Sequence, residues 1–331
     1  GCDALRFNLV TGNSPGNDMR FYTERCEAMR NFANKIWNAS RFLMMNLTID
    51  KCELPGHLEM EDKWILSKLN RVIPEVTENM DKFELGVAAQ KVYDFIWDDY
   101  CDWYIELTKS RLQGDDPSAK ENAQKVLCYV LTQILKLLHP FMPFITEEIW
   151  QAMPHEGDFL MLQQWPERRE DLDFPEEEKA MELIMDAIRA IRTRRSEMNV
   201  PPSKRARLTV ATSEPQVFTA GIPFLKRLGY GSEVTVTGMD GQEETKGSVT
   251  VITHVARISM PMAELVDMEK EKARLEKSLA KNRAELEKLA AKLANPGFVN
   301  KAPANVVEAE RERAEKLATL IAKLEEELAA M

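Results

Sequence analysis

Residues 264–331 carry a hydrophobic pattern that few folds can satisfy. Apolar side chains recur at alternating spacings of three and four from Leu265 to Leu293, and again from Val307 to Leu328, which is the seam of a heptad repeat. The segment NPGFVNKAP separates the two seams, and its Pro-Gly pair is a helix stop. A coiled coil between two chains needs no such turn. The pattern therefore predicts two helices folded back on each other as an antiparallel hairpin.

The two predicted hairpin helices differ in charge. Residues 270–301 contain nine Lys or Arg and four acids, whereas residues 302–331 contain four Lys or Arg and seven acids. Pairing across the hairpin is one explanation, because flanking positions of coiled coils often carry opposite charges. The cationic surplus is larger than pairing requires, however, and it suits a track of backbone phosphates. The cations that would contact such phosphates are Lys281, Arg283, Lys288 and Lys292.

The rest of the chain is long enough for more than one core, with 331 residues in total of which 44% are hydrophobic. Helical periodicity dominates residues 1–153, and several long amphipathic helices with short connections predict a bundle. Within it, Pro74 is expected to kink or end one helix and Thr146 to cap another. Beyond residue 200 the period switches to two around a helix near 215–228, which predicts a small α/β module.

Several classes of protein are disfavoured by composition. Five cysteines without a CxxC pair indicate reduced thiols and no zinc site, which predicts a cytoplasmic protein with no metal. No apolar run is long enough to span a membrane, and no signal peptide is present. The chain begins with Gly1 and is periodic almost at once, so we expect a piece of a longer protein.

One helix face departs from the acidic balance of the chain. The formal net charge is −10, yet residues 28–49 contain no Asp or Glu. Opposite an ordinary apolar stripe, this segment presents amides, cations and an aromatic ring at Asn34, Lys35, Asn38, Arg41 and Phe42. Bases of single-stranded RNA loops are recognised by stacking on aromatic rings and by hydrogen bonds to their edges, while cations contact the phosphates. The face therefore suits an RNA loop.

The charge changes sign in the middle of the chain. Residues 155–186 hold eleven acids and three basic residues, whereas residues 189–207 hold seven basic residues and one acid. The basic stretch is a second candidate for contact with an RNA backbone. A solvated face, or contact with another domain, explains it equally well. The positions expected to contact phosphates are Arg192, Arg194, Arg195 and Lys204.

Together, several motifs resemble the C-terminal region of bacterial-type valyl-tRNA synthetases, which are class I aminoacyl-tRNA synthetases. The motif LLHPFMPFITEEIW is similar to the whole valine, isoleucine and leucine group. RNFANKIWNASRF, combined with a terminal coiled coil that contains GFVNKAPA, is typical of the valine enzymes. Further support comes from GCDALRF, YDFIWDDYCDWYIEL and MNVPPSK, so the resemblance runs essentially from end to end.

The resemblance implies a mainly α fold in four parts. Residues 1–22 would end the connection to a catalytic domain, and residues 23–153 would form an anticodon-binding helical bundle. An acidic linker, a basic helix and a small α/β module would occupy 154–263. Residues 264–331 would form a coiled-coil arm that contacts the body of the tRNA.

The function implied is recognition of tRNA(Val) by a monomeric, cytoplasmic ligase that joins valine to tRNA(Val) with ATP and Mg²⁺. The HIGH-like and KMSKS-like signatures of the ATP site do not occur in these 331 residues. The catalytic and editing domains are expected upstream in the same chain. We therefore expect residues 1–331 to be inactive alone and to bind no cofactor, metal or membrane.

The same resemblance points to particular anticodon contacts. Lys35 and Phe42 match the family's site most directly, as do Ile105 and Glu106 in CDWYIEL. Glu106 would accept a hydrogen bond from an exocyclic amine, and Ile105 would supply an apolar wall. The alternative is that the asparagines of the acid-free face cap neighbouring helices and that Phe42 belongs to the core.

Two other functions remain open. The chain is also compatible with the tRNA-binding region of an isoleucine or leucine synthetase, although such enzymes often end in zinc or other modules for which no cysteine pattern exists here. The other alternative is a non-enzymatic adaptor that dimerises through its coiled coil. The turn between the two seams disfavours the adaptor.

Overall fold

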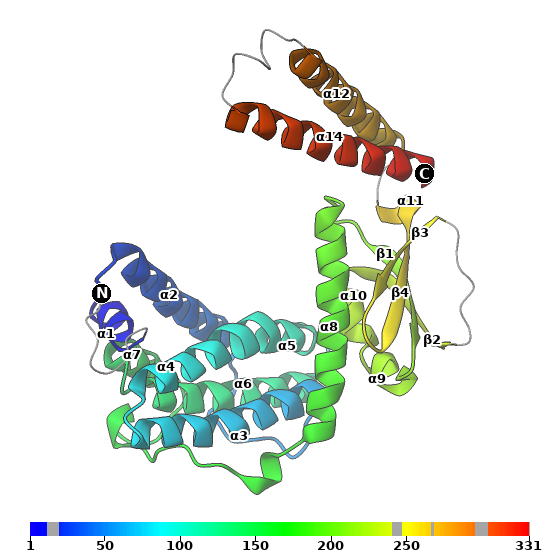
Figure 1. Cartoon of the computed structure of the whole chain (residues 1–331). Coiled ribbons are helices and arrows are strands. Elements are labelled where there is room, and N and C mark those ends of the chain that lie inside the picture. The colour runs from blue at the N-terminus through cyan, green and yellow to red at the C-terminus, as the bar shows by residue number, and fades with distance from the viewer. Residues whose placement is uncertain (12–19, 240–246, 266–267, 295–303, 331) are drawn as a thin grey trace. The chain divides into compact units, whose positions relative to one another are not determined.

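The computed structural model describes residues 1–11, 20–239, 247–265, 268–294 and 304–330 (Figure 1). The chain divides into two compact units, Gly1–Glu182 and Leu183–Met331. Helices dominate both units, and one small sheet lies in the second, which confirms the predicted mainly α class with a small α/β module. The four domain boundaries expected from the sequence stay predictions.

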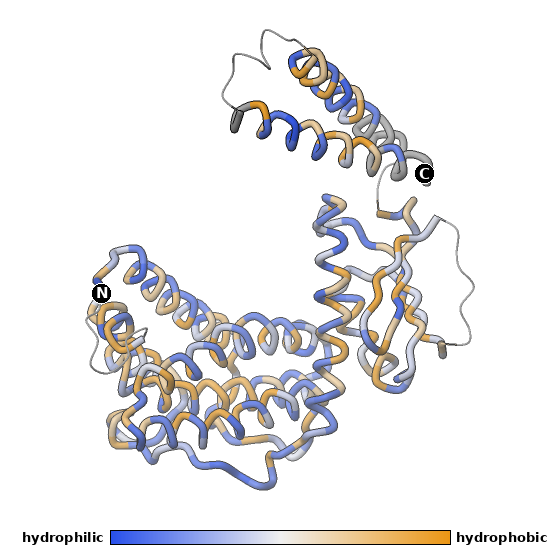
Figure 2. The backbone as a smooth tube through the Cα atoms, in the orientation of Figure 1, coloured by the Kyte–Doolittle hydropathy of each residue, from blue (hydrophilic) through white to orange (hydrophobic). Residues whose placement is uncertain are grey.

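The first unit is a bundle of helices around one hydrophobic core. Its helices are α1 (Cys2–Val10), α2 (Thr23–Asn46), α3 (Met60–Asp81), α4 (Leu85–Asp94), the π-helix η1 (Phe95–Tyr104), α5 (Ile105–Leu112), α6 (Pro117–Leu138) and α7 (Pro143–Ala152). Short 3-10 turns η2 (Leu160–Leu162) and η3 (Glu170–Leu172) follow, and α8 (Pro175–Glu197) begins in this unit. Figure 2 shows hydrophobic and hydrophilic residues alternating along the helices, as expected where one face packs on the core.

Local sequence explains where several of these helices begin. The Asp116 side chain accepts hydrogen bonds from the backbone N–H of Ser118 and Ala119 and so caps α6. The cap predicted for α7 was wrong, because α7 begins before Thr146. Asp3 of α1 accepts hydrogen bonds from the N–H groups of Phe144 and Ile145, at 3.3 and 2.7 Å. The sequence does not reveal this cap, since its acceptor lies far away along the chain.

Pro74 does not end its helix, which was one of the two outcomes expected from the sequence. It lies inside the continuous helix α3, on the exposed side, while its neighbours Ile73 and Val76 are buried. A proline inside a helix costs about 3 kcal/mol through the lost hydrogen bond and steric contact. Burial of the apolar face on both sides of Pro74 offsets that cost, because each buried aliphatic side chain contributes about 1.5–3 kcal/mol.

The prediction that all cysteines are reduced was also wrong. Cys52 and Cys128 form a disulfide that joins the segment between α2 and α3 to the middle of α6. The two residues are 76 positions apart in sequence, so only the packing of the bundle brings them together. The other cysteines, at positions 2, 26 and 101, are free thiols.

The second unit contains a four-stranded sheet. Its elements are β1 (Ala206–Thr212), α9 (Pro215–Ala220), α10 (Ile222–Leu228), β2 (Gly231–Gly238), β3 (Ser248–Ile252), β4 (Ala256–Pro261) and α11 (Met262–Leu265). The strand order is β2-β1-β4-β3, with β1 parallel to β2 and the other neighbours antiparallel. A parallel pair needs a crossover connection, which α9 and α10 supply. The predicted small α/β module is confirmed, but the single helix expected near 215–228 is divided into α9 and α10.

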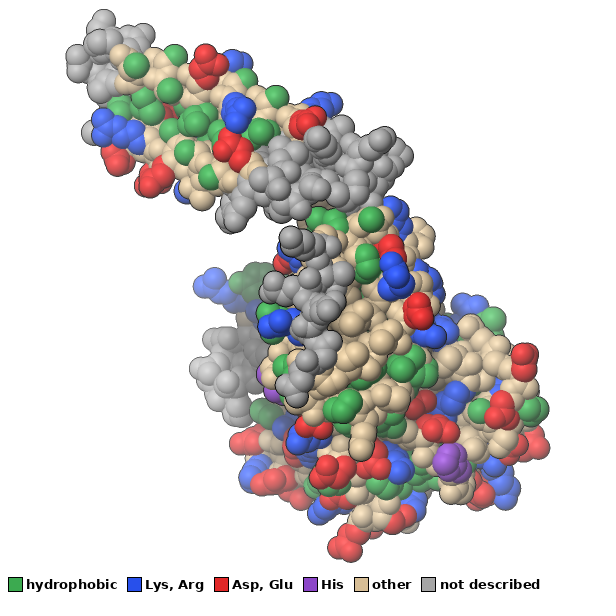
Figure 3. Space-filling model, turned by 90° about the vertical axis from the view of Figure 1, so that its right-hand side faces the viewer, with side chains coloured by type: hydrophobic (Ala, Val, Ile, Leu, Met, Phe, Trp, Pro, Cys, Tyr) green, Lys and Arg blue, Asp and Glu red, His purple; other side chains and the backbone are tan. Residues whose placement is uncertain are grey.

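Two long helices, α12 (Met268–Ala294) and α14 (Ala304–Ala330), pack against each other as a hairpin. Leu289, Val307 and Ile321 of the predicted seams are buried, and the described seam positions between them are buried or half-buried. The heptad seam is therefore confirmed. The predicted turn NPGFVNKAP lies outside the described residues. Figure 3 shows hydrophobic side chains gathered along the hairpin, with charged side chains beside them.

Candidate nucleic-acid interface

The acid-free face of α2 is exposed along most of its length. Phe32, Ile36 and Leu43 are buried on the opposite side of the helix. This burial turns Asn34, Asn38 and Arg41 toward solvent. Because the three polar side chains are exposed, they can form hydrogen bonds with a ligand.

Lys35 lies at the junction between α2 and η1, where its ammonium group is held between a ring and a carboxylate. Its Nζ is 3.6 Å from the centroid of the Trp97 ring and 2.7 Å from Oδ1 of Asp102. Trp97 stacks on Tyr93, with ring centroids 5.6 Å apart, so the ring is itself fixed by the core. The Asp102 side chain is 53% exposed, so an anionic ligand can replace it without burying an unpaired carboxylate.

Phe42 lies further along the same face of α2, where its ring contacts α5. The Lys109 ammonium is 5.5 Å from the centroid of its ring, and Lys109 also pairs with Glu106. Phe42 is half-buried, and 38% of the Glu106 side chain is exposed. An aromatic face and a carboxylate thus lie near each other on two helices, as recognition of a base by stacking and by an edge hydrogen bond requires.

The sequence did not indicate three further residues that lie beside this face, namely Trp97, Asp102 and Lys109. Most aromatic residues of 95–104 are buried in the core, whereas Trp97 is half-buried. The π-helical winding of η1 changes which side chains share a face, and periodicity of 3.6 cannot reveal this.

Ile105 is only 6% exposed, so it belongs to the bundle core and offers little surface to a ligand.

The four basic residues predicted near the end of α8 have different surroundings. Arg194 is exposed and pairs with Glu197 at 3.2 Å, and Lys204 is half-buried. Arg192 donates from Nε to the carbonyl oxygen of Leu228 at 2.8 Å. Arg195 is 2% exposed and donates to backbone carbonyls, so it lies in the interior and cannot contact a phosphate directly.

The hairpin contains cations that pair with acids of the other helix and cations that are open to solvent. Arg283 pairs with Glu325 at 2.5 Å, and Lys292 pairs with Glu310 at 2.7 Å, in both cases across the two helices. Lys281 and Lys288 are exposed and have no partner among the side chains that the structure describes. Pairing across the hairpin therefore accounts for part of the cationic surplus and leaves part of it open to solvent.

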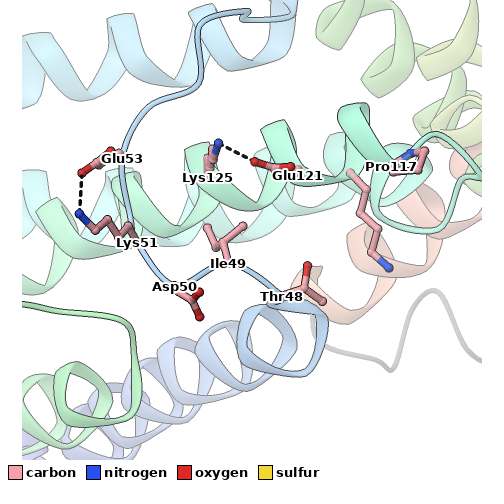
Figure 4. A pocket seen from close by; sticks show the side chains of 9 residues that line it. Thr48, Ile49, Asp50, Lys51, Glu53, Pro117, Glu121 and Lys125 are labelled. Atoms are coloured by element: carbon pink, nitrogen blue, oxygen red, sulfur yellow. Dashed lines mark ion pairs between the residues drawn. The ribbon is translucent and has the colours of Figure 1, made fainter.

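A groove between the end of α2 and the start of α6 offers less to a polyanion. It is lined by residues of 48–53 and of α6 (Figure 4). Lys51 pairs there with Glu53 at 3.8 Å, and Lys125 with Glu121 at 2.6 Å. Because carboxylates neutralise these cations, the groove has little net charge. Elsewhere in the described part of the chain, no helix could cross a membrane and no cluster of three metal-ligating side chains is found.

Comparison with known proteins places this geometry in a family. Residues 62–210 match the anticodon-binding domain of tRNA ligases, which defines the class as aminoacyl-tRNA synthetases. Residues 267–331 match the tRNA-binding arm of valyl-tRNA synthetase. The chain therefore matches the C-terminal region of valyl-tRNA synthetases, and the resemblance inferred from its motifs is confirmed.

The similarity to individual relatives extends over nearly the whole chain. The valine–tRNA ligase of Clostridium acetobutylicum is 47% identical over 100% of this chain and 38% of its own length. That of Carboxydothermus hydrogenoformans is 49% identical over 95% of this chain and 36% of its own length. The chain thus corresponds to the C-terminal part of these relatives and spans less than two fifths of their length. A solved LeuRS chain from Agrobacterium radiobacter, in a complex with tRNA, is only weakly similar. It aligns with a TM-score of 0.42 and 19% identity over 53% of this chain and 20% of that chain.

Proposed function

We propose that this chain binds tRNA(Val), reading the anticodon loop with the acid-free face of α2 and holding the tRNA body with the hairpin. The observation that carries the proposal is the junction of α2 with η1 and α5. There Lys35, Phe42 and Glu106 supply a cation, a ring and an acceptor, each of them partly exposed. These are the three kinds of group that contact phosphates, base faces and base edges in an RNA loop.

The reaction belongs, in this proposal, to the whole protein. A valine–tRNA ligase joins valine to tRNA(Val) with ATP and Mg²⁺ in the cytoplasm, and the residues described here contribute binding only. We propose that the chain acts as a monomer, because its two coiled-coil helices satisfy each other within one hairpin. Valine-dependent ATP–pyrophosphate exchange by residues 1–331 at a rate above a buffer blank would contradict this division of labour.

Substitution of Phe42 tests the anticodon part of the proposal. The 331-residue chain is titrated against a tRNA(Val) transcript and against the same transcript with an altered anticodon. Phe42→Ala should weaken binding of the cognate transcript by about 1–3 kcal/mol, which is the contribution of one stacked base. Phe159→Ala is the matched control, because Phe159 is also an aromatic residue, is 53% exposed and lies outside α2, η1 and α5.

The thermal transition distinguishes binding from packing. Phe42→Ala should leave the melting temperature close to that of the control and should reduce the affinity for the cognate transcript. If the variant instead melted much earlier and kept its affinity, Phe42 would be a core residue. The assignment of the α2 face would then be wrong.

Deletion of the hairpin tests the second part. Removal of residues 264–331 should weaken tRNA binding and flatten its salt dependence, since each lost phosphate contact removes nearly one unit of the slope of log K against log salt. Discrimination between anticodons should survive, because phosphate contacts fix position and carry no base information. An unchanged affinity and slope would make the hairpin a structural element only.

A further inference from the structure

A second surface without compensating acids lies in the α/β module, where the end of α8, the loop after it and the end of α10 converge. Residues 192–207 and 221–231 contain eight Lys or Arg and a single acid, Glu197. Carboxylates pair with two of the eight cations, Arg194 and Arg207. The remaining positions decide what the surface can bind.

Backbone carbonyls and an aromatic ring hold the cations that lack a carboxylate. Arg205 donates from Nη1 to the carbonyl oxygens of Lys226 and Gly231, at 3.0 and 3.3 Å. The guanidinium of Arg195 lies 5.0 Å from the centroid of the Tyr230 ring. Carbonyls and rings fix a cation without neutralising it. Among the described residues, no carboxylate pairs with Arg195, Lys204, Arg205, Lys226 or Arg227.

Tyr230 is held in a backbone conformation that side chains rarely adopt. Its φ is +58°, in the left-handed region, although glycines stand on both sides of it. Such a conformation costs on the order of 1 kcal/mol or more and persists where the surroundings enforce it, often at ligand sites. Here the strain places a half-buried ring beside Arg195, whose Nε and Nη1 are buried and have no hydrogen-bond partner in the part of the chain described.

The charges of this surface favour one kind of ligand. An interior guanidinium without a carboxylate raises the positive potential around Tyr230, and exposed Arg205 and Lys226 add to it. Arg and Lys are the side chains that contact RNA phosphates, and a Tyr hydroxyl also donates to them. The two carboxylates at this surface, Glu197 and Glu264, are already paired with Arg194 and Arg207, which leaves few acceptors for a base edge. The surface therefore suits the sugar–phosphate backbone and not the bases.

We propose that Arg205, Lys226, Arg227 and Tyr230 form a further RNA contact that binds the phosphodiester backbone of the same tRNA, with Arg195 as a positioning residue beneath the Tyr230 ring. This inference rests on the proposed function and adds a contact to those of the bundle and the hairpin. Such a contact holds the α/β module on the RNA. It supplies affinity and orientation and carries no anticodon specificity.

A double variant that removes two charges provides the main test. Lys226→Gln with Arg227→Gln should weaken binding of the tRNA(Val) transcript by on the order of tenfold per lost contact at 0.1 M salt, and should lower the salt slope by nearly two. The matched control is Lys51→Gln with Lys82→Gln, which changes the net charge equally at exposed positions outside the surface. Its affinity should stay within about twofold of that of the wild-type chain.

A second variant separates binding from folding. Tyr230→Gly removes the ring and also relieves the left-handed backbone, since glycine adopts positive φ without strain. The thermal transition measured by circular dichroism should stay close to that of the wild-type chain, while tRNA binding weakens. Weakened binding together with an early thermal transition would make Tyr230 a packing residue, which contradicts its place in the proposal.

The outcomes separate this inference from the proposed function. If the wild-type chain discriminates anticodons and the Lys226/Arg227 double variant keeps wild-type affinity and salt slope, the inference is overturned and the proposed function stands. If the wild-type chain binds every tRNA alike, the anticodon function fails, and the slope of the double variant still decides the present proposal. Competition by polyglutamate as strong as that by RNA would show a general acidic-ligand site and would also overturn it.

Discussion

Ion pairs at similar distances lie in the interior of the bundle and on the surface of the hairpin. In the bundle, Arg111 lies 2.9 Å from Glu61 and 2.5 Å from Asp62, and all three side chains are at most 11% exposed. In the hairpin, Arg283 and Glu325 are also 2.5 Å apart, but their side chains are 60% and 46% exposed. Water screens the second pair far more than the first.

The difference in exposure separates two uses of charge. A buried carboxylate depends on its partner, because loss of the partner leaves a charge without water or counter-ion. An exposed pair contributes little to stability and can exchange its partner for another anion. The Arg111 network stiffens α5, the helix that also presents Glu106 and Lys109 to the proposed anticodon site. The hairpin pairs, by contrast, leave their cations available to RNA phosphates.

The largest expected effect comes from breaking the buried network. Arg111→Leu should lower the free energy of unfolding of the first unit by about 3–5 kcal/mol, because Glu61 and Asp62 would stay buried without their cation. All six tryptophans lie between residues 37 and 165, so tryptophan fluorescence during urea unfolding reports this unit alone. Adding Glu61→Gln and Asp62→Asn should recover part of the loss. A change below about 1 kcal/mol would show that water reaches the network.

A smaller effect is expected from pH. Burial raises the pKa of Glu61 from 4.5 to about 7, and Arg111 lowers it only partly because its guanidinium is shared with Asp62. A raised pKa means that the folded state binds the proton more tightly. The contribution of Glu61 to stability is therefore fully present below pH 4.5 and is lost as pH rises through about 7. This loss amounts to at most about 3 kcal/mol.

The Glu61→Gln variant measures this contribution. Gln is neutral at all pH values, so the variant should lose less stability than the wild-type chain between pH 5 and pH 8. Some pH dependence should remain, because burial also raises the pKa of Asp99 to about 6. Asp99→Asn is the control for that remainder. Parallel stability curves for the wild-type chain and Glu61→Gln would contradict the assignment to Glu61.

Periodicity predicted most of this architecture, because long amphipathic helices, alternating strands and heptad seams each report burial through spacing alone. The bundle, the α/β module and the hairpin were predicted on that basis and are confirmed. What the sequence could not reveal depends on contacts between distant segments. Asp3 caps α7, and Cys52 reaches Cys128, only after the bundle has packed.

The candidate site shows the same limit at the level of side chains. The absence of acids marked the α2 face in advance, yet the carboxylate of Asp102 comes from η1 and completes the surroundings of Lys35. The basic stretch of α8 was visible as a count of charges. Its division into an interior Arg195 and an exposed Arg194 depends on which side of the helix packs against the module. A charge count cannot distinguish the two.

The smallest expected effect belongs to the exposed pair of the hairpin. In a double-mutant cycle of Arg283→Ala and Glu325→Ala, the coupling energy should be about 0.2–1 kcal/mol, since exposed pairs are screened and cost side-chain entropy. Amide hydrogen exchange of residues 276–294 measures the stability of the hairpin in each variant, and the coupling energy follows from these stabilities. The two single variants should change the affinity for tRNA in opposite directions. Arg283→Ala should weaken binding. Glu325→Ala should strengthen it a few-fold, because a competing carboxylate is removed. If both single variants weakened binding equally, the pair would serve to hold the hairpin together, and the contrast with the buried network of Arg111 would disappear.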